Sequence, residues 1–137
     1  MTKTTASPSF LFSIKGGLLV ASLLIGGSLA LALLTPEVIS KALSLRLLGV
    51  MLGAFVLVYA NAVPKVLPPV MRGDAAAEQG MRRFTGWCLA LGGAAYMLVW
   101  MFAPIEYANL LAMFFLFAAH VVVIARGLWR RKRPTRA

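Results

Sequence analysis

The chain has 137 residues, of which 61% are hydrophobic and 13% are charged, and its mean hydropathy is +0.85. A soluble domain is usually about 45–50% apolar and about 25% charged. A water-soluble globule of this size cannot bury so much apolar surface, so the composition excludes a disordered chain and favours an integral membrane protein. The net charge of +10 lies outside the apolar stretches, so lipid head groups and membrane topology explain it better than nucleic acid does.

Four apolar stretches predict four transmembrane helices. Their expected bounds are 16–34, 42–64, 84–103 and 105–125. Each stretch has about the length that a helix needs to cross ~30 Å of hydrocarbon. The sequence therefore predicts an all-α fold, in which one transmembrane domain forms a four-helix bundle.

Two proline-containing turns divide the four helices into two hairpins. Residues 35–37 (Thr-Pro-Glu) match an N-cap, a proline at the first helical position and an acid in the first turn. Residues 104–106 (Pro-Ile-Glu) repeat this arrangement before the fourth helix. A glycine pair precedes each turn, at 26–27 and at 92–93. This similarity suggests a tandem 2+2 repeat, and the alternative is a chance likeness between apolar hairpins.

Basic residues predict the orientation of the helices. Twelve of the 14 Lys and Arg residues precede residue 17, lie between residues 65 and 83, or follow residue 125, which leaves Lys41 and Arg46. We therefore expect both ends of the chain on the cytoplasmic side, as the positive-inside rule requires, with a basic tail at 126–137. Four residues of this tail are expected to contact anionic lipid head groups: Arg130, Arg131, Lys132 and Arg133.

The first apolar stretch also resembles a signal peptide. Basic residues precede it, and residues 30–32 (Ala-Leu-Ala) match a cleavage site. Cleavage there would leave three spans and the same cytoplasmic C-terminus.

Polar residues within the spans suggest a contact between the second and fourth helices. Arg46 lies toward the outer end of one face of the second helix, and Asn61 lies at the inner edge of that face. Glu106, Asn109 and His120 share a face of the fourth helix. We expect a polar seam in which Arg46 pairs with Glu106, and Asn61 with His120. Three simpler roles are open: an Arg46 side chain that reaches the head groups, a Glu106 that stabilises its helix N-terminus, and a His120 that hydrogen-bonds between helices.

Glycines mark the faces on which helices can approach closely. Gly49 and Gly53 form a small-xxx-small pattern on the face that carries Arg46. Gly86 and Gly93 share a face of the third helix. We expect these four glycines to pack against other helices rather than lipid.

Converging catalytic groups are scarce in this sequence. The chain has one His, one Cys and four Asp and Glu residues, and no disulfide can form within it. It also lacks the common zinc, redox and phosphate-loop motifs. We therefore expect no enzyme activity, no metal and no cofactor.

A short motif ends the second predicted helix. Residues 61–65 read Asn-Ala-Val-Pro-Lys, an N-x-x-P-K pattern. It resembles the bacterial membrane protein family typified by the immunity protein against the sporulation-delaying killing peptide. The resemblance covers about a quarter of the chain and rests on Asn61, Pro64 and Lys65. A Gly-x-Arg-x-Pro-Trp segment expected after the motif is missing here. Asn and Pro are also common helix stoppers, which explains the same residues without a family.

The resemblance implies a helical protein of the bacterial cytoplasmic membrane that gives immunity or acts as a signalling receptor, without a cofactor. The sequence itself favours a non-enzymatic protein that acts through a membrane protein partner or as a homo-oligomer: an accessory, regulatory or immunity-type subunit. The alternative is a small oligomeric transporter or channel component that uses the polar seam. A metal-handling or redox subunit has the least support.

Overall fold

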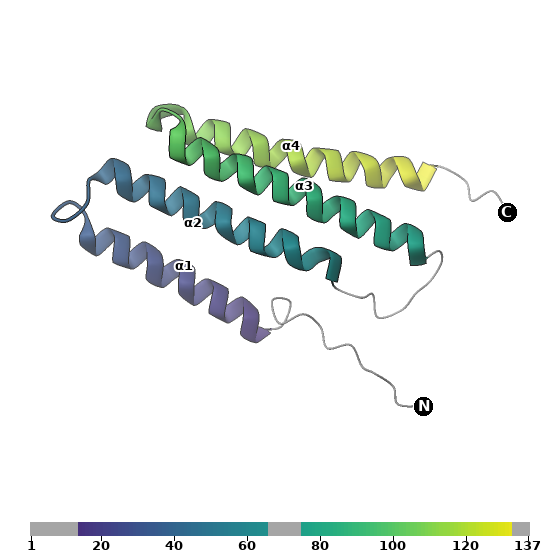
Figure 1. Cartoon of the computed structure of the whole chain (residues 1–137), viewed down its shortest axis with the longest axis horizontal. Coiled ribbons are helices and arrows are strands. Elements are labelled where there is room, and N and C mark those ends of the chain that lie inside the picture. The colour runs from purple at the N-terminus through teal and green to yellow at the C-terminus, as the bar shows by residue number, and fades with distance from the viewer. Residues whose placement is uncertain (1–13, 66–74, 133–137) are drawn as a thin grey trace.

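The computed structural model describes residues 14–65 and 75–132, and these residues are almost entirely helical. Four long helices follow one another: α1 (Ile14–Leu34), α2 (Lys41–Ala62), α3 (Ala75–Phe102) and α4 (Ile105–Lys132) (Figure 1). A short 3-10 helix, η2 (Val63–Lys65), extends α2. The predicted all-α four-helix fold is confirmed, and each long helix is long and apolar enough to cross a membrane.

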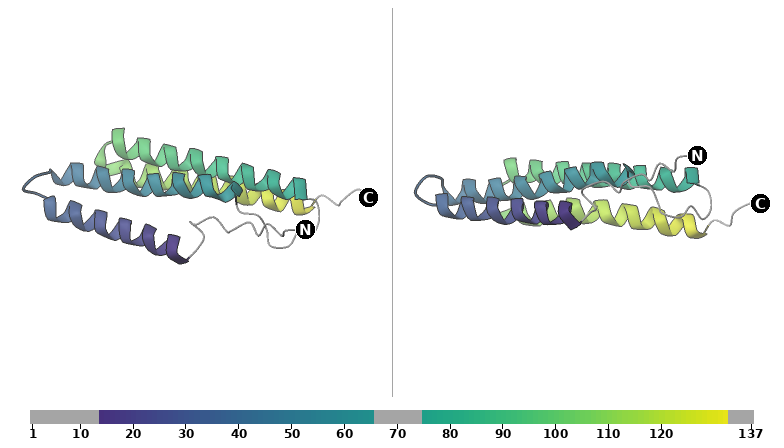
Figure 2. Two further views of the ribbon diagram at one scale, coloured as in Figure 1. Left: turned by 60° about the horizontal axis from the view of Figure 1, so that its bottom comes forward. Right: turned by 90° about the horizontal axis from the view of Figure 1, so that it is seen from below.

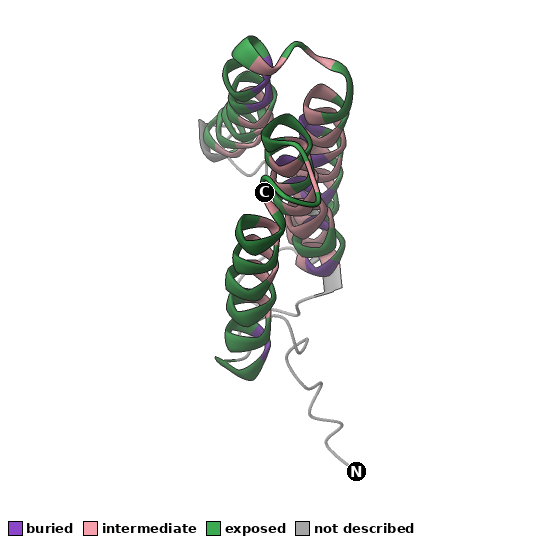
Figure 3. Ribbon diagram, turned by 90° about the vertical axis from the view of Figure 1, so that its left-hand side faces the viewer, coloured by how far each residue is buried: buried purple, intermediate pink, exposed green. Residues whose placement is uncertain are grey.

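The helices run antiparallel to their neighbours in the chain. The short α1–α2 and α3–α4 connections lie at one end of the bundle; α4 ends at the other, and α1 begins about midway between the two ends (Figure 1). Seen from below (Figure 2, right) and end-on (Figure 3), α1 and α4 lie on the same side of the α2–α3 pair. α3 packs closely on both α2 and α4, whereas α1 lies more loosely on α2. The third helix is therefore the centre of the bundle.

α2 begins within one residue of the expected bound of 42, but its N-terminal cap differs from the predicted one. α2 begins at Lys41, and the Ser40 hydroxyl caps it by accepting a hydrogen bond from the Leu43 N–H (3.2 Å). The Thr35 hydroxyl instead donates to the Leu31 carbonyl oxygen in the last turn of α1 (2.8 Å). The prediction that residues 35–37 start the second helix is therefore wrong, because Thr35 belongs to the end of the preceding helix and a turn separates the two.

The largest differences from the predicted spans are at the start of α3 and the end of α4, where the helices are longer. α4 begins at Ile105, as expected, and the Pro104 carbonyl oxygen accepts hydrogen bonds from the N–H groups of Tyr107 (3.1 Å) and Ala108 (3.0 Å). α3 starts at Ala75 rather than 84, and α4 continues past 125 to Lys132. The first part of the predicted basic tail is therefore helical.

Small residues form the contacts of α3. Gly49 and Gly53 of α2 and Gly86 and Gly93 of α3 are all buried. A Cβ atom added at Gly93 would lie 3.0 Å from Val56 Cγ1, and one added at Gly49 would meet the Trp100 ring. On the other side of α3, the most buried residues of α4 are small as well: Ala108 and Ala112 are 0% exposed. In lipid, close backbone approach of this kind favours helix association through van der Waals contact.

The two hairpins are not packed alike. Gly92 and Gly93 of α3 both face neighbouring helices, since a Cβ atom at Gly92 would lie 2.8 Å from Ala119 Cβ. Of the pair in α1, Gly27 lies near the Met51 sulfur, whereas nothing lies within 4 Å of a Cβ atom at Gly26. The most apolar part of α1 contains no buried residue (Figure 3). The matching glycine pairs thus have different surroundings in the two hairpins.

Candidate functional site

Arg46 joins α2 to the end of α3. Its guanidinium donates three hydrogen bonds to backbone carbonyl oxygens, those of Trp100 (2.8 Å), Met101 (2.9 Å) and Ala103 (2.9 Å). The last carbonyls of a helix have no partner within the helix and carry the negative end of its dipole, so a cation there is stabilising. The Arg46 side chain therefore acts as a C-terminal cap that comes from another helix.

The predicted seam between the second and fourth helices is not assembled. α3 lies between α2 and α4, and Arg46 and Glu106 form no ion pair. The alanine face of α4, with Ala108 and Ala112, packs toward the bundle. Glu106 and Asn109 point away from this contact and are exposed. Arg46 and Glu106 were matched because they lie at the same expected depth in the membrane. Equal depth does not make two helices neighbours, and close packing of small residues makes α3 the neighbour of both α2 and α4.

His120 lies beside a cavity to which all four helices contribute. Its Nδ1 is 2.8 Å from the Leu116 carbonyl oxygen, and because a carbonyl only accepts, Nδ1 carries the proton in this bond. In the neutral ring, Nε2 then keeps its lone pair. The cavity has a volume of about 360 Å³, and its lining is mostly apolar: Val20, Phe55, Val56, Val58, Tyr59, Leu89, Leu116 and His120. The expected partner of His120, Asn61, is not part of this cavity.

Asn61 instead lines a second cavity, of about 400 Å³, where α2 and η2 meet α3. Its polar lining residues are Asn61 and Arg83, and its aromatic one is Trp87. The remaining lining residues are small or cyclic: Ala60, Pro64, Gly86 and Ala90. The structure thus brings Asn61, which the sequence had placed in the polar seam, together with Arg83 and Trp87 of α3.

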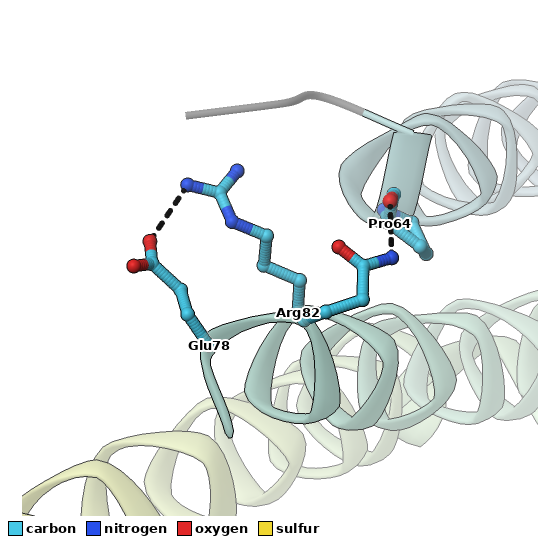
Figure 4. A network of polar contacts seen from close by, with 4 residues as sticks. Pro64, Glu78 and Arg82 are labelled. Carbon is cyan, nitrogen blue, oxygen red and sulfur yellow. Dashed lines mark hydrogen bonds and ion pairs between the residues drawn. The ribbon is translucent and has the colours of Figure 1, made fainter. Parts of the chain in front are cut away.

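Beside this second cavity, one polar contact joins η2 to α3 and another lies within α3 (Figure 4). The Gln79 side-chain amide donates to the Pro64 carbonyl oxygen (3.1 Å), which ties η2 to α3. One turn of α3 also contains an ion pair between Arg82 Nη2 and Glu78 Oε1 (3.1 Å). Glu78 therefore pairs with Arg82, while the adjacent Arg83 lines the cavity.

The basic end of α4 lies at the same end of the bundle as this cavity (Figure 1). The Arg126 guanidinium stacks over the Phe84 ring of α3, 4.2 Å from its centroid. Arg130 is exposed, and Arg131 and Lys132 belong to the last turn of α4. Arg133, the fourth predicted head-group ligand, lies outside the described residues. The described cations thus concentrate at one end of the helices.

Metal-binding geometry is not present in the part of the chain that the structure describes. No three His, Cys, Asp or Glu side chains gather there to hold a metal ion. His120, Glu106 and Cys88 lie on different parts of α3 and α4, and Cys88 lines a shallow depression between these two helices.

Comparison with known proteins finds no relative: the chain matches no family model, no curated protein and no solved structure. The arguments about function therefore come from the geometry. Sequence reasoning missed the association of Arg83 and Trp87 with Asn61. The signal was the i, i+4 spacing of Arg83 and Trp87, which places both on one helix face.

Proposed function

We propose that this chain is an integral membrane protein without enzyme activity that acts through a membrane protein partner. The observation that carries the proposal is the outward face of α4. Glu106 and Asn109 are exposed on this helix among the described residues, whereas His120 borders the cavity that all four helices line. A transmembrane helix with a polar face is expected to turn that face toward protein.

Energetic reasons favour a partner at this face. A polar side chain left in hydrocarbon lacks the hydrogen bonds it has in water. Hydrogen bonds between transmembrane helices contribute about 0.6–2 kcal/mol each, so the amide of Asn109 gains from a neighbouring helix. Met113 and Phe117 are exposed on the same face and supply the apolar contact area around it.

The charge distribution supports an orientation. Arg82, Arg83 and Arg130 belong to the parts of α3 and α4 that lie farthest from the two short connections, whereas α1, with Lys15 in its first turn, begins nearer the middle of the bundle (Figure 1). We place the end that is opposite the two short connections on the cytoplasmic side of a bacterial inner membrane, where Arg130 and its basic neighbours contact anionic lipids. An accessory, regulatory or immunity-type subunit fits such a protein, since its work is done by contacts within the membrane.

A photo-crosslinking experiment tests the proposal. A photoreactive residue placed at Met113 is expected to crosslink one membrane protein in intact cells, and Asn109→Leu is expected to abolish the adduct. The same residue placed at Leu91, which is 66% exposed on α3, is the matched control. The proposal is wrong if Met113 and Leu91 crosslink the same protein, or if the Met113 adduct persists in the Asn109→Leu variant. Either result would mean that this face of α4 is not the specific binding surface for a partner.

The second candidate function is that of a small oligomeric transporter or channel component. Its supporting observation is the cavity of about 360 Å³ that contains His120 and Tyr59 among all four helices. Flux measured in proteoliposomes, with His120→Ala and Glu106→Gln as variants, tests it. If both variants show the same flux as the unmodified protein, His120 and Glu106 take no part in transport.

A further inference from the structure

The cavity between α2, η2 and α3 combines an opening to the outside with polar groups at one end. Arg83 is exposed and Trp87 is 71% exposed, so the cavity is reached from the surface of the bundle. We propose that it binds a phospholipid, with the lipid phosphate on Arg83, and that it prefers an anionic head group.

The walls of the cavity are set by close helix contacts. A Cβ atom added at Gly86 would lie 2.8 Å from Pro64 Cγ and 3.0 Å from the Ala60 carbonyl oxygen, so only glycine allows this approach. The hydrogen bond from Gln79 to the Pro64 carbonyl fixes the same junction. The junction between Ala60, Pro64 and Gly86 is therefore a fixed part of the cavity wall, and the Arg83 and Trp87 side chains complete the lining.

The charge available in the cavity is that of Arg83. Arg82 is neutralised by Glu78, whereas no carboxylate among the described residues pairs with Arg83. A guanidinium presents two parallel N–H donors that match two phosphate oxygens. The Asn61 side-chain amide lines the same cavity and offers a further donor. A basic pocket between transmembrane helices at the cytoplasmic side is a recognised form of lipid head-group site.

The order of residues along α3 favours a lipid over a free phosphate. Arg83 directly precedes the apolar stretch that begins at Phe84, and therefore lies at head-group depth. Trp87 and Ala90 follow on the same cavity wall, one and two turns deeper. A phosphate on Arg83 thus places the glycerol and the start of an acyl chain against Trp87 and Ala90. The inference shares the membrane location with the proposed function, but it needs no protein partner.

Trp87 provides the measurement. The full chain with Trp100→Phe and Trp129→Phe keeps Trp87 as its single tryptophan, whose emission is excited separately from that of the three tyrosines. Trp100→Phe is mild, because the Trp100 indole N–H is buried without a hydrogen-bond partner among the described residues. The purified protein is reconstituted in phosphatidylcholine vesicles, and quenching by brominated phosphatidylglycerol is compared with quenching by brominated phosphatidylcholine. We expect about a tenfold preference for phosphatidylglycerol, the factor that corresponds to one net charge-assisted hydrogen bond.

Variants of the same protein separate the site from general charge. Arg83→Gln is expected to lower the preference to about one. Arg130→Gln removes the same charge from the exposed end of α4 and is expected to leave the preference intact. Ala90→Phe fills the apolar half of the cavity while retaining Arg83, and is expected to reduce quenching by both lipids. Equal losses in Arg83→Gln and Arg130→Gln, or full quenching in Ala90→Phe, would overturn the proposal.

Two further outcomes test whether the ligand is a lipid or a soluble phosphate, and whether the protein is in the membrane. If inorganic phosphate or glycerol 3-phosphate reverses the quenching by brominated phosphatidylglycerol, the site takes a soluble phosphate and the lipid assignment is wrong. If neither brominated lipid quenches Trp87, the helix is not in the bilayer, which overturns the membrane location as well. A missing adduct at Met113 beside a normal lipid preference would overturn the partner proposal alone.

Discussion

Replacing Arg46 with Met is expected to destabilise the bundle at the junction of α2 and α3. The substitution keeps an unbranched side chain of similar length but removes all three hydrogen bonds to the Trp100, Met101 and Ala103 carbonyls. These carbonyls lie at or just beyond the C-terminal end of α3, where the helix supplies no N–H donors. The substitution therefore removes the hydrogen bonds that hold the C-terminal end of α3 against α2.

The structure allows the size of this effect to be worked out. A hydrogen bond to a charged group contributes about 1.5–3 kcal/mol, and three bonds at the low end of that range amount to about 4–5 kcal/mol. Ordering an Arg side chain costs about 2 kcal/mol. The net loss expected for Arg46→Met is therefore about 2–3 kcal/mol. Arg46→Lys has a single ammonium group that cannot span the three carbonyls, so we expect about half of that loss.

Unfolding of the purified protein in mixed micelles by increasing SDS, followed by circular dichroism, measures these differences. Lys41→Met is the matched control, because Lys41 is exposed at the start of the same helix, and it is expected to have little effect. Glu106→Gln tests the ion pair that the sequence suggested. If Arg46→Met costs no more than Lys41→Met, or if a double-mutant cycle shows strong coupling between Arg46 and Glu106, the capping role assigned to Arg46 is refuted.

The remaining predictions concern packing and topology. Gly53→Ala places a Cβ atom against Met97 and 3.2 Å from the Gly93 carbonyl oxygen, so we expect a loss of about 1–3 kcal/mol in the same unfolding assay. Gly26→Ala, which meets nothing within 4 Å, should leave stability unchanged or raise it by up to about 1 kcal/mol; equal losses would contradict the packing described. In a Cys88→Ala background, a membrane-impermeant thiol reagent should label Ser40→Cys in intact cells and Arg130→Cys only in inverted vesicles. Labelling of both cysteines from one side would contradict the four-span topology.

Apolar runs predicted the helices well because lipid-facing helices need continuous apolar sequence. The expected 16–34 compares with Ile14–Leu34, and the start of the fourth helix was exact. The errors lie where polar side chains decide the ends. The Thr35 hydroxyl bonds backward to α1, and this local choice is not visible in the residue pattern. The ion pair between Glu78 and Arg82 supports polar first turns of α3 that hydropathy alone left out.

The candidate site could be predicted only in part. A helical wheel identifies residues that share a face, such as Glu106 and Asn109, but it does not identify the helix opposite that face. Arg46 binds backbone carbonyl oxygens and not a carboxylate. Every residue has a backbone carbonyl, so the sequence does not show which carbonyls an arginine will bind. Asn61 meets Arg83 and Trp87 because η2 folds against α3, a contact that depends on Gln79 and on the missing side chain of Gly86.

The glycine pairs explain why α3 is central. Adjacent residues on a helix point about 100° apart, so two consecutive glycines open two different faces to close approach. In α3 both faces are used: Gly93 lies against Val56 of α2, and Gly92 against Ala119 of α4. Helices in lipid gain little from apolar contact as such, so the faces that permit the closest approach determine the neighbours. Of the pair in α1, Gly27 lies near Met51 of α2, whereas nothing lies within 4 Å of a Cβ atom at Gly26. A glycine pair therefore allows a helix to have two close neighbours. Whether two helices of the same chain take these places depends on how small the residues are that face the glycines, here Val56 and Ala119.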